Sequence, residues 1–368
     1  MILMSTCCLA KAMAGGPLDG QQKVELGLIG LSKDGRHFVH SGSGLPFKVW
    51  GLNYDHDASN RLLEDYWKEE WNAVVDHFRQ MKELGANAVR IHLQLGKFMT
   101  SPQEPDQGSL EQLSRLLKLA EDTGLYLDIT GLGCYRKEDV PQWYNELEEA
   151  RRWEVQARFW EAVAEKCKSS PAVFCYDLIN EPIVTEDKTG RDWLPGAFGD
   201  RYFVQRITLD FAGRTQQEIA RSWVDQMVAA IRKRDRRHLI TVGAIPWALT
   251  WPGAKPLFYS KEVSQNLDFV SIHFYPKKGE VEKALTALSV YDIGKSLVIE
   301  EMFPLSCSVT ELDQFVDGSR KVASGWFGFY WGKPIAAYQK EKSSPSETLT
   351  LDWLKYFSVK APQMSTSH

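Results

Sequence analysis

The sequence of 368 residues lacks several features that would place it in a specialised class of protein. It contains no run of about 18 apolar residues, so we expect no membrane span. Its 44 basic and 48 acidic residues give a formal net charge of −4, which does not favour nucleic acid as a partner. Its six cysteines have neither the spacing of zinc ligands nor that of a small disulfide scaffold.

The chain also lacks a linker rich in proline, serine or glycine, and no Gly-x-Gly-x-x-Gly follows its first predicted strand. The second absence disfavours a dinucleotide-binding fold, and we expect no cofactor. We therefore predict one catalytic domain over residues 23–368, preceded by a leader over residues 1–22.

The leader supports two interpretations. Its Ala12-Met13-Ala14 resembles a signal-peptidase site, which would make the leader a remnant signal peptide and the protein secreted or periplasmic. The apolar stretch before this site is short and has no basic start, which favours a disordered leader instead. The compartment is left open.

Aromatic residues are abundant, with 13 Trp, 13 Tyr and 17 Phe. Many of them will fill the core, but 13 Trp exceed what packing alone usually needs. Aromatic side chains combine a large apolar area with a flat face, and stacking on sugar rings is one expected use for the surplus.

Two short strand-like runs, residues 24–31 and 36–40, flank the sequence Ser32-Lys33-Asp34-Gly35. Asp-Gly between apolar runs is a strong signal for a β-hairpin, because glycine supplies the positive φ of a tight turn. We expect this hairpin to cap the bottom of a barrel.

After the hairpin, short apolar runs alternate with segments whose apolar residues recur at helical spacing. The predicted strands are residues 47–53, 86–93, 125–130, 172–179, 238–244, 268–274, 296–301 and 325–331. The predicted helices include residues 67–84, 110–121, 153–168 and 219–232. Eight such repeats predict an α/β protein with a single (β/α)8 TIM barrel and a short N-terminal β-hairpin. The longest connection, residues 182–214, is expected at the active-site rim.

The fourth predicted strand ends in the sharpest local motif, Asn180-Glu181-Pro182. The C-terminal ends of barrel strands surround the catalytic site, so the carboxylate of Glu181 is expected to point into the barrel mouth. A lone glutamate there is more often a helix cap or a member of a rim salt bridge. The catalytic interpretation is favoured because Glu300-Glu301 ends the seventh strand in the matching place.

Two carboxylates that face each other across a barrel mouth suit glycosidic cleavage. One acid protonates the leaving oxygen, and one carboxylate attacks the sugar or activates water. Side chains alternate along a strand, so only one of Glu300 and Glu301 is expected to point into the barrel. The residues alone do not separate the two.

The ordered set of Asn-Glu-Pro closing strand four, a glutamate closing strand seven and Trp331 closing strand eight resembles glycoside hydrolase family 5, the cellulase family of retaining (β/α)8 glycosidases. The resemblance covers residues 47–331. It implies that Glu181 is the acid/base, that Glu301 is the nucleophile, and that Asn180 hydrogen-bonds the sugar 2-hydroxyl. Glu300 would then pack outward or pair with a neighbouring loop.

The same resemblance implies supporting roles for four further residues. Arg90 on strand two would orient the nucleophile and keep it ionised, with a purely structural ion pair as the alternative. His273 and Tyr275 match the His-x-Tyr of strand six, and Tyr275 would hydrogen-bond the nucleophile. Trp331 would form the floor under the sugar at the cleavage point.

Other aromatic and histidine side chains are candidates for sugar contact, with ordinary rim packing as the alternative for each. These candidates are Tyr54, Tyr135, Trp143, Trp247 and Trp251, together with His56 and His92. The trio Asp55-His56-Asp57 could suggest a metal, but a hydrogen-bonding loop is the preferred interpretation and we predict no metal site.

Two departures from the family pattern bear on the substrate. No histidine follows strand three in residues 128–133, and Met302-Phe303 stands where Phe-Gly or Trp-Gly is common. We predict a monomeric retaining glycoside hydrolase whose substrate is a β-linked, and specifically β-1,4-linked, glucan or mannan, as polysaccharide or oligosaccharide. The alternatives are a transglycosylase or exo-acting glycosidase on the same barrel, a non-catalytic carbohydrate-binding barrel, and a metal-dependent barrel hydrolase.

Overall fold

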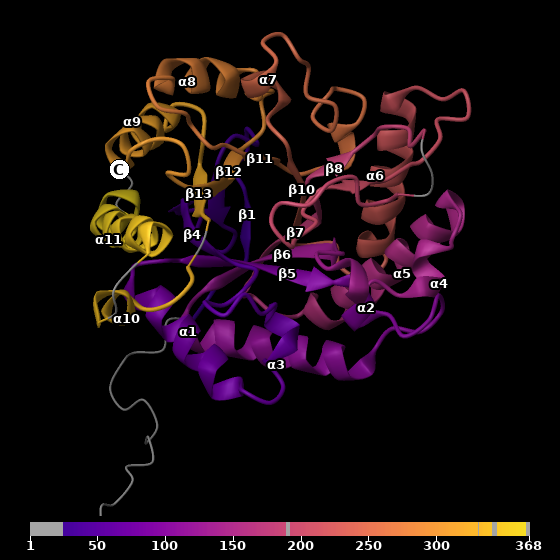
Figure 1. Ribbon diagram of the computed structural model, residues 1–368, viewed down its shortest axis with the longest axis horizontal. Helices are drawn as coiled ribbons and strands as arrows, with labels where there is room; N and C mark the ends of the chain where they lie inside the picture. The colour runs from indigo at the N-terminus through magenta and orange to yellow at the C-terminus, as the bar shows by residue number, and fades with distance from the viewer. Residues whose placement is uncertain (1–24, 189–191, 330, 341–343, 366–368) are drawn as a thin grey trace, which may run out of the picture.

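The computed structural model describes residues 25–188, 192–329, 331–340 and 344–365, and its centre is a closed barrel of eight parallel strands (Figure 1). In chain order these strands are β4 (Val49–Tyr54), β5 (Ala88–Gln94), β6 (Tyr126–Gly133), β7 (Val173–Asn180), β10 (Leu239–Ala244), β11 (Val270–His273), β12 (Leu297–Met302) and β13 (Gly325–Gly328). Each predicted strand corresponds to one of them, and the predicted (β/α)8 fold is confirmed. The eighth strand ends at Gly328, earlier than predicted. The predicted leader, residues 1–22, lies outside the described residues.

Helices surround the barrel on its outside (Figure 1). They are α1 (Trp71–Glu83), α2 (Leu95–Phe98), α3 (Gln107–Thr123), α4 (Gln142–Asn145), α5 (Glu149–Cys167), α6 (Gln216–Arg232), α7 (Trp247–Thr250), α8 (Val281–Ser289), α9 (Val309–Ser319), α10 (Ile335–Lys340) and α11 (Pro345–Ser365). The four predicted helices correspond to α1, α3, α5 and α6.

Helix α3 illustrates why these segments are helical. The side chain of Asp106 accepts a hydrogen bond from the backbone N–H of Ser109, which satisfies one of the free donors at the first turn. Leu113 and Leu117 are buried and four residues apart, so they share one face against the barrel. The helix ends at Gly124, whose φ of 66° favours glycine.

The N-terminal hairpin closes the bottom of the barrel, as predicted. Strands β1 (Ile29–Leu31) and β2 (Phe38–His40) pair in antiparallel fashion, and β3 (Pro46–Phe47) adds a third strand. Phe38 contacts Phe174 near the start of β7, with ring centroids 5.0 Å apart, and Phe269 just before β11, at 5.2 Å. Residue 47 was expected in the first barrel strand, but it belongs to this small sheet.

Helix α11 extends the structure beyond the last barrel strand and packs against β4. The rings of Trp50 and Phe357 stack with centroids 4.6 Å apart, and the indole N–H of Trp50 donates a hydrogen bond to the Phe357 carbonyl. This contact brings the start of α11 close to the barrel mouth, where Leu349 lines a cavity. The strands β8 (Pro182–Ile183) and β9 (Gln205–Arg206) pair within the long connection after β7.

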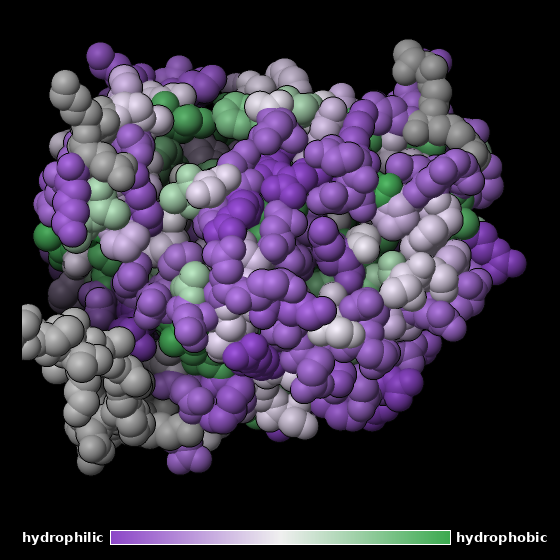
Figure 2. All heavy atoms as spheres, turned by 60° about the horizontal axis from the view of Figure 1, so that its bottom comes forward, coloured by the Kyte–Doolittle hydropathy of each residue, from purple (hydrophilic) through white to green (hydrophobic). Residues whose placement is uncertain are grey.

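The surface is mainly polar on the face shown in Figure 2, where hydrophobic residues occur in small, separate places. Among the described residues, no helix is both long and apolar enough to cross a membrane.

Candidate active site

Two carboxylates lie at the C-terminal mouth of the barrel, one on each side. Glu181 directly follows β7, and Glu301 is the second-to-last residue of β12. The backbone of Glu181 has a φ of 46°, a region that residues other than glycine rarely adopt. Its N–H donates to the carbonyl of Gly243 on β10, which holds this conformation in place. Unusual backbone geometry of this kind is concentrated at functional sites.

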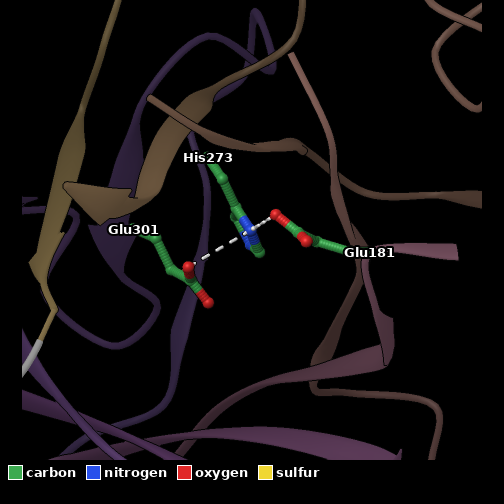
Figure 3. A group of neighbouring side chains, drawn as sticks. All are labelled: Glu181, His273 and Glu301. Carbon is green, nitrogen blue, oxygen red and sulfur yellow. Dashed lines mark hydrogen bonds and ion pairs between the residues drawn. The ribbon is translucent and has the colours of Figure 1, made fainter. Parts of the chain in front are cut away.

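His273, the last residue of β11, lies between the two carboxylates (Figure 3). Its Nδ1 is 2.9 Å from Oε1 of Glu181 and 3.5 Å from Oε2 of Glu301. One ligand atom from each of these three residues lies within 4.8 Å of the other two. Although burial acts in the opposite direction, Glu301 and Glu181 together with Glu300 raise the pKa of His273 to about 10. The ring is therefore an imidazolium at neutral pH and donates hydrogen bonds.

Glu301 has two further partners that fix its orientation. Arg90 donates from Nη1 to Oε1 of Glu301 at 2.7 Å, and the hydroxyl of Tyr275 donates to Oε2 at 2.6 Å. Burial raises the pKa of Tyr275 well above its usual value, so its hydroxyl remains a donor at neutral pH. Burial also raises the pKa of Glu301, while the positive charges of His273 and Arg90 act against that shift.

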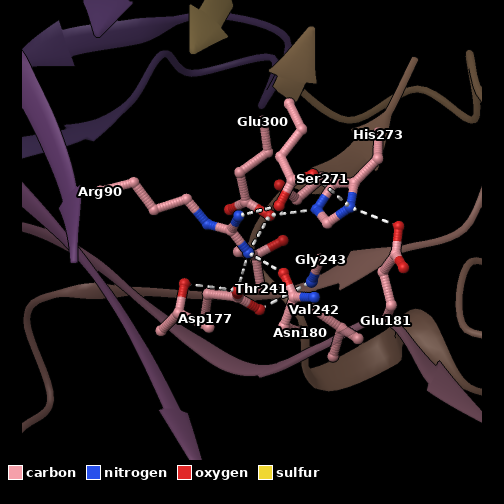
Figure 4. Close-up of polar contacts among 12 residues, drawn as sticks. Arg90, Asp177, Asn180, Glu181, Thr241, Val242, Gly243, Ser271, His273 and Glu300 are labelled. Carbon is pink, nitrogen blue, oxygen red and sulfur yellow. Dashed lines mark hydrogen bonds and ion pairs between the residues drawn. The ribbon is translucent and has the colours of Figure 1, made fainter. Parts of the chain in front are cut away.

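Arg90 is fully buried and connects four strands of the barrel floor (Figure 4). Its Nη2 donates to Asp177 at 2.8 Å and to Oδ1 of Asn180 at 2.9 Å, and its Nη1 also donates to Asn53 at 3.1 Å. Asn53 was not among the predicted site residues, although it is close to the C-terminal end of the first barrel strand, where a polar side chain points to the same mouth. A buried guanidinium with this many acceptors holds the floor rigidly.

The prediction for Glu300 is wrong, because its side chain also points into the barrel. It is fully buried, with Oε2 3.4 Å from both Nη2 of Arg90 and Nε2 of His273. The reason is a β-bulge: Ile272 pairs with Ile299, whereas His273 pairs with Glu301, so the register shifts by one residue at Glu300. A bulge interrupts the alternation of side chains on which the prediction rested. Burial alone would raise the pKa of Glu300, but Arg90 and His273 lower it to about 2.

The remaining predicted residues divide into those at the cavity and those away from it. His92 and Asn180 line the cavity, and burial and the charge of Arg90 lower the pKa of His92 well below its usual value. The predicted residues that do not line the cavity are Tyr54, His56, Trp143, Trp247 and Trp331.

Each of these residues away from the cavity contacts another side chain of the protein. Tyr54 and Trp331 are fully buried and in edge contact, and Tyr54 hydrogen-bonds His77 at 2.6 Å. His56 pairs with Asp55 at 2.9 Å, in agreement with the preferred interpretation of that loop. Trp143 packs on its neighbour Tyr144, and Trp247 stacks on Trp251 with centroids 5.0 Å apart.

The cavity above the carboxylates has a volume of about 710 Å³, within the usual range for small-molecule sites. Besides Glu181, Glu301 and Tyr275, it is lined by residues that were not predicted as site residues: Ala58, Pro195, Gly196, Ala197, Phe198, Phe203, Val204, Phe303, Leu305, Phe329, Lys333, Tyr338, Ser346, Glu347, Leu349 and Thr350. Only the aromatic content of the long connection after β7 gave a sequence signal for Phe198 and Phe203.

Glu181, His273 and Glu301 are the one group of the described residues with the spacing of a metal site. A histidine must lose its proton to bind a metal, and a pKa of about 10 opposes this for His273. The arrangement is better suited to an imidazolium that holds two carboxylates than to a cation site.

Known proteins resemble this chain in sequence and in fold. A family model described as "Cellulase (glycosyl hydrolase family 5)" matches residues 44–302. Mannan endo-1,4-beta-mannosidase 5 of Arabidopsis thaliana is 30% identical over 122 residues, covering 30% of this chain and 22% of that protein. Mannan endo-1,4-beta-mannosidase A of Podospora anserina is 27% identical over 186 residues, covering 45% of this chain and 42% of that protein.

The matched segments thus span less than half the length of either relative. Among solved structures, the exo-beta-1,4-mannosidase Op5Man5 from Opitutaceae bacterium strain TAV5 has the same fold, with a TM-score of 0.67 at 16% identity over 91% of this chain and 62% of that chain. Because the family model covers more than half of the sequence, the chain belongs to glycosyl hydrolase family 5.

Proposed function

We propose that the protein hydrolyses a β-glycosidic bond with retention of configuration, using Glu301 as nucleophile and Glu181 as acid/base. The observation that carries this proposal is the spacing of the two carboxylates, since one oxygen of Glu181 lies within 4.8 Å of one oxygen of Glu301. Retaining enzymes hold the two carboxyl groups about 5–5.5 Å apart, whereas inverting enzymes need about 6.5–9.5 Å to admit a water.

In the first step, an oxygen of Glu301 attacks the anomeric carbon while Glu181 gives its proton to the departing oxygen. This forms a glycosyl ester on Glu301 and releases the leaving group as an alcohol. In the second step, Glu181 removes a proton from water, which attacks the same carbon and releases Glu301 as a carboxylate. Arg90 and Tyr275 occupy both oxygens of Glu301 and so orient it for attack.

For the substrate, we propose a β-1,4-linked mannan or glucan, with mannan first because two relatives are named as mannan endo-1,4-beta-mannosidases. Transfer of the glycosyl group to an acceptor sugar uses the same residues and is the second candidate reaction.

The test is reducing-sugar release from mannan, glucomannan, cellulose derivatives, mixed-linkage glucan, xylan and laminarin. Wild type, Glu301→Gln and the neighbouring variant Glu300→Gln are compared. We expect release by wild type on one or two polymers, none by Glu301→Gln, and residual release by Glu300→Gln. Early NMR spectra of the product should show the β-anomer first. An α-anomer first, or activity that survives in Glu301→Gln, would contradict the mechanism. Added acceptor sugar would reveal transfer products.

A further inference from the structure

The cavity is polar at its floor and apolar along its walls. Its polar floor contains the carboxylates of Glu181 and Glu301, the hydroxyl of Tyr275, and the side chains of His92 and Asn180. These groups have the donors and acceptors that a sugar ring needs at the cleaved bond. The walls above them come from four segments far apart in the sequence.

The first wall segment is the connection between β8 and β9, with Pro195, Ala197, Phe198, Phe203 and Val204. Phe303 and Leu305 follow β12, and Phe329 follows β13. The last segment is the helical C-terminal part, with Tyr338 on α10 and Leu349 on α11. Aliphatic and phenyl side chains predominate in the first three segments, whereas the C-terminal segment adds Leu349 and Tyr338 beside polar side chains. Aliphatic and phenyl groups cannot hydrogen-bond sugar hydroxyls.

Four polar residues of the described walls have partners within the chain. Lys333 and Glu347 form an ion pair at 2.7 Å. Thr350 donates its hydroxyl to the carbonyl of Ser346, and the hydroxyl of Ser346 lies 3.0 Å from that of Ser344. Burying sugar hydroxyls against the apolar part of the wall costs free energy, because they would lose water without gaining partners there.

Two apolar side chains of this cavity are open to water in the unliganded chain. Phe198 is 72% exposed and Leu305 is 55% exposed, and they are two of only seven large hydrophobic residues exposed in the described part of the chain. Both line the cavity that holds the catalytic pair. Exposed apolar groups beside a concave site mark a surface that an apolar ligand covers.

We infer that the substrate is an amphiphilic glycoside, in which the sugar at Glu181 and Glu301 is joined to an alcohol whose alkyl chain lies along these walls. The substrate class is therefore the glycolipids. This inference rests on the proposed function for cleavage of a β-glycosidic bond by Glu301 and Glu181, and it places a lipid alcohol where a mannan or glucan would have its next sugar. Glu181 protonates the glycosidic oxygen, and the chain departs as an alcohol.

The test compares methyl, hexyl and octyl β-mannosides and β-glucosides, each below its critical micelle concentration. These leaving groups have similar basicity, so differences in kcat/KM report contact with the chain and not leaving-group chemistry. Each methylene that the walls bury should raise kcat/KM by roughly two- to fourfold. From methyl to octyl, we expect a rise of at least about 100-fold if the walls bury the whole chain. Equal kcat/KM for the methyl and octyl glycosides would overturn the inference and leave the proposed function intact.

Three variants test whether the walls cause the preference for the octyl glycoside. Phe198→Asp and Leu305→Asp place a charge on the wall, and each should lower the octyl-to-methyl ratio of kcat/KM by about tenfold or more. Leu45→Asp is the matched control, because Leu45 is 63% exposed between β2 and β3 at the bottom of the barrel, and it should leave the ratio unchanged. A ratio unchanged in the two wall variants would contradict the inference.

Binding of the same glycosides to Glu301→Gln, measured by calorimetry, separates the two proposals. If no glycoside or polymer is hydrolysed by wild type, the proposed function fails. The inference is then decided by binding alone: octyl glycosides must bind Glu301→Gln more tightly than methyl glycosides, with a negative heat-capacity change. Equal binding of the two would overturn it.

Discussion

Substitution of Glu300 is the most direct test of which groups set the pKa of His273. The change is Glu300→Gln, which removes a buried negative charge and keeps the shape of the side chain. The groups around His273 are Glu181 after β7, Glu300 and Glu301 on β12, and Arg90 and His92 on β5. Among them, Glu300 is the carboxylate that faces Nε2 of the ring, at 3.4 Å.

The size of the effect follows from that distance. Two unit charges 3.4 Å apart interact by about 5 kcal/mol at an effective dielectric constant of about 20, which corresponds to an upper limit of about 3.6 pK units. Opposite charges at such range usually shift a pKa by about 1–3 units. The pKa of His273, now about 10, should therefore fall to between about 7 and 9 in Glu300→Gln.

Two assays report this change. NMR titration of the His273 ring follows its pKa directly and needs no substrate. The alkaline limb of kcat/KM should move to lower pH by the same amount, because only the imidazolium donates from both ring nitrogens and keeps Glu181 in place. Glu111→Gln on α3 is the control, since Glu111 is 76% exposed and should change neither curve. An unchanged His273 titration in Glu300→Gln would refute the reasoning.

Four further results are expected. Glu181→Gln should lower kcat/KM by about 10²–10⁴-fold for alkyl glycosides and much less for dinitrophenyl glycosides, whose leaving group needs no proton; an equal loss on both would contradict the acid role. Gly243→Ala should destabilise the fold by about 1–3 kcal/mol in a denaturant titration, because a Cβ there would lie 2.5 Å from Oε2 of Glu300. Because the folded pKa of His273 is raised from 6.5 to about 10, the stabilisation from its carboxylate partners is complete below pH 6.5 and lost as pH rises towards 10, so Tm should fall over that interval and fall less in Glu300→Gln. Asp128→Asn should keep Tm within a few degrees of wild type, because burial and Glu300 raise the pKa of Asp128 well above its usual value, and the amide has the shape of the neutral form that this shift favours.

The barrel could be predicted because each strand and helix is indicated by the pattern of residues within its own segment. Each barrel strand is a short apolar run, and segments such as residues 110–121 have the spacing of an amphipathic helix. The positions of Glu181 and of the pair Glu300-Glu301 followed from the general rule that barrel strands end at one mouth, and the resemblance to the family selected Glu301. The same rule also points to Asn53, close to the end of the first barrel strand.

The errors concern features that depend on tertiary structure. The bulge at Glu300 is a property of the pairing between β11 and β12, and nothing in the apolar run of β12 indicates an extra residue. The burial of Trp331 depends on Tyr54 and His77, which lie far away in the sequence. The apolar walls are assembled from segments more than a hundred residues apart, such as those of Phe198 and Leu349, so no local pattern could reveal them.

The bulge also explains how the barrel centre balances its charges. It brings Glu300 inward beside Glu301, so the floor holds these two carboxylates together with Asp177 and Asp128, against the cations Arg90 and His273. Full ionisation of all four acids would leave an excess of buried negative charge, which is costly. Neither oxygen of Asp128 and only one oxygen of Glu300 lies within hydrogen-bond distance of a donor. A proton on Asp128, directed to Glu300, satisfies both and leaves the three carboxylates of Glu300, Glu301 and Asp177 against Arg90 and His273. The extra carboxylate on β12 thus raises the pKa of His273, while the raised pKa of Asp128 limits the excess of negative charge.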